Sequence, residues 1–90
     1  MQVTHVVKSW NFLYKDIESG ERLADIRLND RRYAVGDFLD LREFDPVKFQ
    51  YTGRSQLVEI TYIQNSHSNP CAISHEALHK DYVVLSIKKV

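Results

Sequence analysis

The stretch from Gly20 to Asp30 constrains the fold most, because it combines a helix stop, a short strand and a charged turn within eleven residues. An amphipathic run precedes Gly20, and glycine readily adopts the left-handed conformation that closes a helix. A strand with one apolar face is expected next, formed by Ala24, Ile26 and Leu28. Asp25 and Arg27 should then project together from the opposite, solvated face, which makes that face a candidate site.

Four of the chain's six arginines lie within residues 22–32. Flanked by Trp10 and Tyr33, they could form an anion-binding rim with stacking surfaces, suited to single-stranded RNA or a nucleotide. Three acids are interleaved with them, namely Glu21, Asp25 and Asp30. This mixture is equally typical of an ordinary salt-bridged surface, so both interpretations stay open from the residues alone.

Composition favours one globular domain over residues 1–90, since 43% of the residues are apolar and no segment is biased enough to be a linker. Lys plus Arg equals Asp plus Glu at twelve each, so no overall field draws the chain to nucleic acid or to a membrane. Affinity for phosphate must come from local clustering. The single cysteine, Cys71, excludes an internal disulfide and, without a signal-like N-terminal run, predicts a cytoplasmic protein.

The N-terminal segment predicts a strand over residues 1–8 and a helix over residues 10–19. His5 lies on the apolar face of that strand, where a core or rim histidine is commoner than a catalytic base. Ser9 is a candidate helix cap, and the expected core-facing stripe of the helix is Trp10, Leu13, Tyr14 and Ile17. Trp10, in the first turn, could also lie at the edge of a cleft.

Further strands are predicted over residues 38–44, 56–63 and 82–87, with turns at 29–32 and 35–37. Residues 45–53 should form a projecting hairpin connection and residues 65–70 a loop, and residues 73–80 could form a short second helix. The apolar run over 82–87 suggests a strand in the middle of the sheet, covered on both faces. Five strands with one helix after the first predict a mostly β, barrel-like α+β domain.

Several segments in this order carry a resemblance to a known family: His5 to Lys8, Trp10, Gly20 to Arg27, Asn29-Asp30, Val35-Gly36-Asp37, Leu41 to Pro46, Tyr51 to Arg54 and Tyr82 to Ile87. The chain resembles a small uncharacterised family of bacterial and phage proteins related to the ASCH (activating signal cointegrator homology) domains of the PUA-like superfamily. The resemblance implies a PUA-like pseudo-barrel with a cleft beside the helix-to-strand junction. Relatives use that cleft for RNA or modified nucleosides.

The junction departs from the family pattern, because Gly20-Glu21-Arg22-Leu23 stands where Gly-x-Lys-Thr is usual. Some ASCH relatives are amidohydrolases that resemble this domain in using a lysine at the Arg22 position and a threonine at the Asp25 position. Arginine stays protonated at neutral pH, so it suits phosphate recognition better than base catalysis. The departure favours binding, with an amidohydrolase of modified nucleosides as the alternative and His5 as its best candidate base.

We therefore expect a small RNA- or nucleotide-binding module with an anion-binding cleft at residues 20–30. Arg22, Arg27 and Arg31 would contact phosphate, with Lys8 as an accessory cation. The full set of expected ligand-binding residues is His5, Lys8, Trp10, Arg22, Asp25, Arg27, Asn29 and Arg31. No catalytic residue, cofactor or membrane partner is assigned.

A literal H-E-x-x-H motif occurs at His75-Glu76-Ala-Leu-His79, a pattern that on a helix can hold zinc beside a general base. Cys71 could add a ligand. The setting disfavours a zinc hydrolase, because the motif lies in a short polar insertion and only Asp81 follows it as a strong ligand. We expect no resident metal and retain the zinc enzyme as a remote alternative.

Overall fold

The structure, a computed structural model, describes residues 2–65 and 81–90. Its elements, in chain order, are β1 (Thr4–Trp10), α1 (Asn11–Glu18), β2 (Ala24–Leu28), β3 (Phe38–Asp45), β4 (Gln50–Asn65) and β5 (Tyr82–Lys89). The five strands form one sheet in the order β1-β3-β4-β5-β2. The possible helix over residues 73–80 and most of the loop predicted over 65–70 lie outside the described residues.

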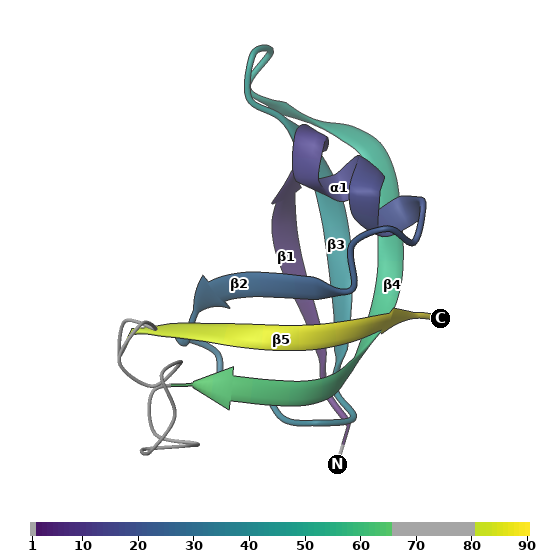
Figure 1. The fold of residues 1–90 in the computed structure, drawn as a ribbon. Coiled ribbons are helices and arrows are strands. Elements are labelled where there is room, and N and C mark those ends of the chain that lie inside the picture. The colour runs from purple at the N-terminus through teal and green to yellow at the C-terminus, as the bar shows by residue number, and fades with distance from the viewer. Residues whose placement is uncertain (1, 66–80) are drawn as a thin grey trace.

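The sheet is mixed and strongly curved (Figure 1). β1 is parallel to β3, whereas the pairs β3–β4, β4–β5 and β5–β2 are antiparallel. The sixteen-residue β4 pairs with β3 over its first part and with β5 over its second, and it bends between them so that β2 and β5 lie across β1 and β3. The predicted mostly β pseudo-barrel is confirmed, with β1 and β2 as its two edge strands.

Alternating side chains from the sheet meet the helix in the core. The buried residues of this core cluster are Val7, Tyr14, Ile17, Leu39, Leu41, Val58, Ile60, Val83, Leu85 and Ile87. α1 covers this inner face through Tyr14 and Ile17, which share one side of the helix at i, i+3 spacing, and Leu13 is half-buried beside them. The predicted packing stripe is therefore correct for the helix itself.

The start of the helix differs from the prediction. Ser9 does not cap it, because Ser9 belongs to β1 and points inward, where it is buried. Trp10 ends the strand and occupies the N-cap position without a side-chain cap. At the other end Gly20 has φ +86° and donates its N–H to the carbonyl of Ile17 at 3.0 Å, so the predicted glycine stop is confirmed.

β5 lies between β4 and β2, as expected of a strand inside the sheet. The prediction that it is covered on both faces is wrong. Val83 and Leu85 are buried, whereas Tyr82 is exposed and Val84 is only half-buried. The reason is that α1 packs on the inner face of a single curved sheet. No helix in the described part of the chain is long and apolar enough to cross a membrane.

A buried polar contact fastens the start of β1 to the turn before β3. His5 Nε2 lies 2.9 Å from Asp37 Oδ2, and the Asp37 carboxylate also accepts the backbone N–H groups of Val3 and Ala34, each at 3.1 Å. Tyr33 packs edge-on against the His5 ring. The hydrogen bond from His5, helped by those from the backbone, lowers the pKa of Asp37.

We predict that Asp37→Asn destabilises the fold by about 1–3 kcal/mol at neutral pH, because it disrupts buried charge-assisted hydrogen bonds. A carboxylate whose pKa is lowered by folding stabilises the protein only while it is ionised. The advantage of the wild type should thus shrink as the pH falls below 3.8, the ordinary pKa of the group, and through its folded value. Urea unfolding at pH 7 and pH 3 measures this, with exposed Glu21→Gln as control. An equal difference at both pH values would contradict the assignment.

Candidate anion-binding site

β2 turns its charged face inward. Asp25 is only 5% exposed, whereas Ile26 and Leu28 are 59% and 51% exposed. The prediction that Asp25 and Arg27 project into solvent from an apolar-backed strand is therefore wrong. The physical reason is the position of β2 at the sheet edge, where Arg27 reaches the backbone carbonyl of Lys8 on β1, a partner that an aliphatic side chain could not bond.

Arg27 joins the two edges of the curled sheet. Its Nε donates to Asp25 Oδ2 at 2.5 Å, and its Nη2 donates to the backbone carbonyl of Lys8 at 2.8 Å. Arg22 Nη2 approaches the other Asp25 oxygen at 3.5 Å. Asp25 thus holds two of the four clustered arginines, and Arg27 links β2 to β1, two strands that are not paired with each other.

The seam is the place where Arg27 of β2 reaches Lys8 of β1. A hollow of about 360 Å³ lies there. Five of the eight predicted ligand-binding residues line it: Lys8, Trp10, Asp25, Arg27 and Arg31. The other three lie elsewhere. Arg22 is held behind Asp25, His5 is bonded to Asp37, and Asn29 lines a separate shallow hollow with Asp30 and Asp81.

A larger hollow of about 630 Å³ adjoins the seam, and Lys8 and Arg31 line both. Lys8, Arg42 and Ser55 are cross-strand neighbours in a row over β1, β3 and β4, so their side chains share the outer face of the sheet. Arg54 and Tyr51 complete the polar lining. Sequence reasoning missed Arg42, Arg54 and Tyr51, because only the strand register brings them beside Lys8.

These four cations differ in how far they are already engaged. Lys8 Nζ lies 4.2 Å from the ring centroid of Phe44 and has no acidic partner among the described residues. Arg31 is exposed and makes no hydrogen bond or ion pair with the described part of the chain. Arg42 pairs with Asp40 at 2.9 Å but remains half-exposed, and the Asp40 hydrogen bond raises its pKa. Lys8 and Arg31 are therefore the most available.

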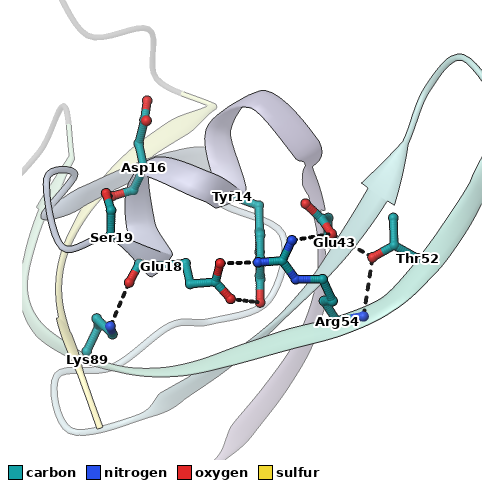
Figure 2. Close-up of polar contacts among 8 residues, drawn as sticks. All are labelled: Tyr14, Asp16, Glu18, Ser19, Glu43, Thr52, Arg54 and Lys89. Carbon is teal, nitrogen blue, oxygen red and sulfur yellow. Dashed lines mark hydrogen bonds and ion pairs between the residues drawn. The ribbon is translucent and has the colours of Figure 1, made fainter.

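Arg54 is the fourth cation, and carboxylates of the domain itself already engage its guanidinium (Figure 2). Its guanidinium pairs with Glu18 of α1 and lies 3.8 Å from the buried Glu43 of β3, which also accepts the hydroxyl of Thr52 at 2.6 Å. The Tyr14 hydroxyl donates to Glu18, and burial followed by the charge of Glu18 raises the pKa of Tyr14. Two carboxylates balance Arg54, which ties β4 to the helix.

Comparison of the sequence with protein families identifies one match. A model of the DUF3850 family, described as a domain of unknown function, matches residues 4–87. The chain belongs to the DUF3850 family. The match runs from the start of β1 almost to the end of β5, and the expectation of an uncharacterised family is confirmed. No curated protein matches the chain.

The zinc motif of this DUF3850 chain, His75-Glu76-x-x-His79 with Cys71, lies outside the described residues. Within residues 2–65 and 81–90, no group of three or more His, Cys, Asp or Glu side chains is placed to hold a metal ion. The expected absence of a resident metal stays a prediction.

We predict that Arg27→Ala lowers the free energy of unfolding by about 2–3 kcal/mol, since it removes two hydrogen bonds, one of them to a buried carboxylate. Arg32→Ala is the matched control, because Arg32 is exposed, and it should change stability by no more than about 0.5 kcal/mol. Chemical denaturation of both variants measures the difference. Equal stability of the two variants would show that the seam does not depend on Arg27.

Proposed function

We propose that this chain is a small RNA- or nucleotide-binding module whose phosphate site lies where the two hollows meet, at Lys8 and Arg31. One observation carries the proposal. The larger hollow is lined by Lys8, Arg31, Arg42 and Arg54 and by no Asp or Glu among the described residues, although the whole chain has a formal net charge of zero. Such local clustering is what a protein without an overall positive field needs in order to hold phosphate.

The cationic residues around the two hollows have two different roles. Arg22 and Arg27 hold Asp25, and Arg27 also donates to the backbone carbonyl of Lys8, so they support the site. Lys8 and Arg31 have no acidic partner among the described residues and can contact phosphate, and Arg42 adds a guanidinium that keeps further N–H donors beside Asp40. Guanidinium groups bind phosphate oxygens in pairs, which suits a nucleotide backbone.

The kinship with ASCH domains of the PUA-like superfamily, and with it a bacterial or phage origin and a cytoplasmic location, is part of the proposal. The curled mostly β sheet with one helix after its first strand supports it. The functional inference does not depend on this kinship, because it rests on the basic hollow.

The alternative, amide hydrolysis on a modified nucleoside, has less geometric support. Asp25 is bonded to two arginines, and His5 is bonded to Asp37 and lines neither hollow. Proton transfer from a positioned base typically contributes about a hundredfold to ten-thousandfold in rate, so little activity is expected without one. We expect no release of acetate from acylated cytidine by the wild type.

The binding proposal predicts that Lys8→Ala with Arg31→Ala weakens binding of a short single-stranded RNA and flattens its dependence on salt. Each lost phosphate contact should reduce the slope of log K against log salt by about 0.7, so the double variant should lose about 1.4. Fluorescence anisotropy with a labelled oligonucleotide, titrated at several salt concentrations, measures both quantities.

Lys88→Ala is the matched control, since Lys88 is exposed on β5 and lines neither hollow. It should leave affinity and slope near the wild-type values. Thermal unfolding of every variant checks that the fold is retained. Undetectable binding at low salt, or a double variant that binds like the wild type, would refute the proposed function.

A further inference from the structure

An aromatic cluster lies on the outer face of the sheet beside the larger hollow. Trp10, Phe44 and Tyr51 form a cross-strand row over β1, β3 and β4. Phe44 is buried at its centre and meets Trp10, Tyr51 and Phe49 edge-to-face, with ring centroids 5.8, 5.1 and 5.4 Å away. The three outer rings remain exposed, at 41% for Trp10, 56% for Tyr51 and 77% for Phe49. Phe44 thus forms the buried centre of the cluster, and three accessible rings pack against it.

The connection between β3 and β4 projects from the body of the domain (Figure 1), and Phe49 is its last residue before β4. Asp45 fixes its shape by accepting the backbone N–H groups of Val47 and Lys48, at 2.9 and 3.2 Å. Phe49 has φ +53°, a left-handed conformation that is unfavourable for a bulky residue. The hairpin therefore exposes the Phe49 ring to solvent and holds its backbone in a strained conformation. Contact with water alone would favour neither feature.

The aromatic cluster is continuous with the basic hollow. Tyr51 belongs to both, and Lys8 lines the hollow while its ammonium lies over the ring of Phe44 and near that of Trp10. We propose that Trp10, Tyr51 and Phe49 stack on unpaired bases of a single-stranded nucleic acid whose phosphates occupy the basic hollow. This inference rests on the proposed function and specifies its ligand.

The spacing of the rings sets a minimum length for the ligand. Trp10 and Tyr51 lie on strands separated by β3, so their backbones are about two strand spacings, roughly 10 Å, apart. One base cannot stack on both rings. The ligand is therefore an oligonucleotide with at least two successive unpaired bases, which offers rings and phosphates in alternation as the protein surface does.

The same geometry discriminates against duplexes, because paired bases are stacked on one another inside the helix and expose only phosphates and groove edges to the protein. Phosphate contacts alone would not distinguish the two forms. A protein partner or a second copy of this chain could also cover exposed rings, but Lys8, which lies beside them and has no acidic partner among the described residues, favours an anionic polymer. Single-stranded RNA and single-stranded DNA share the required chemistry.

Trp10 is the chain's only tryptophan, so its fluorescence reports directly on stacking. We would titrate the wild type with a single-stranded RNA hexamer, the same sequence as DNA, the duplex form and a mononucleotide. We expect both single strands to quench the Trp10 fluorescence, and comparison of their affinities identifies whether RNA or DNA is the preferred ligand. The duplex and the mononucleotide should bind much more weakly.

Leucine variants separate stacking from simple apolar contact. Tyr51→Leu and Phe49→Leu should each weaken binding of the hexamer by roughly 5- to 150-fold, the range expected for loss of one base–aromatic stack. The salt slope should not change. Tyr51→Phe keeps an aromatic ring and should bind the hexamer with nearly wild-type affinity. Tyr62→Leu alters a similarly exposed tyrosine outside the cluster and both hollows, and it should have no effect.

Equal affinity for duplex and single strand, together with unaffected leucine variants, would overturn the stacking inference and leave the phosphate site intact. Absence of binding to any nucleic acid at low salt would overturn both. Self-association of the wild type that is abolished by Phe49→Leu, measured by sedimentation, would assign the cluster to a second copy and likewise overturn the inference.

Discussion

The bridge made by Arg27 between Asp25 and the carbonyl of Lys8 is the contact on which the candidate site depends. β1 and β2 are the two edge strands of one curled sheet, and they are not paired with each other by backbone hydrogen bonds. A carbonyl in a strand lies in the plane of the sheet, whereas the side chain stands roughly perpendicular to it. Arg27 holds the Lys8 carbonyl at the seam, so the Lys8 side chain is left for the two hollows that this residue lines.

Pairing inside the domain also determines which charges are left for a ligand. Asp25 holds Arg22 and Arg27, while Glu18 and Glu43 hold Arg54. The side chains of Arg22 and Arg27 are no more than 25% exposed, and breaking their pairs would leave the buried Asp25 unpaired, so these two arginines are unsuited to exchanging partners with a phosphate. Arg54 is more exposed, but two carboxylates already share it. Lys8 and Arg31 make no such pair with the described residues, and they lie together where the two hollows meet. A chain with balanced charge thereby acquires a local cationic surface.

The sequence predicted the order of elements, the glycine stop at Gly20 and the mostly β curled sheet, because periodicity and turn chemistry act locally. It did not predict which face of β2 points inward. Alternation at Ala24, Ile26 and Leu28 establishes two faces but not the side on which the core lies, and the edge position of β2 reversed the usual choice. Arg42 and Tyr51 joined Lys8 through strand register, which depends on contacts between distant residues and leaves no local signal.

The central claim, that phosphate binds at Lys8 and Arg31 and not at the junction arginines, is tested most directly by NMR. Backbone amide shifts of the wild type would be followed during titration with uridine monophosphate at low salt. We expect the largest changes at Lys8, Arg31 and Arg42 and small changes at Arg22 and Asp25. Changes centred on Arg22 and Asp25, with none at Lys8 or Arg31, would contradict the claim.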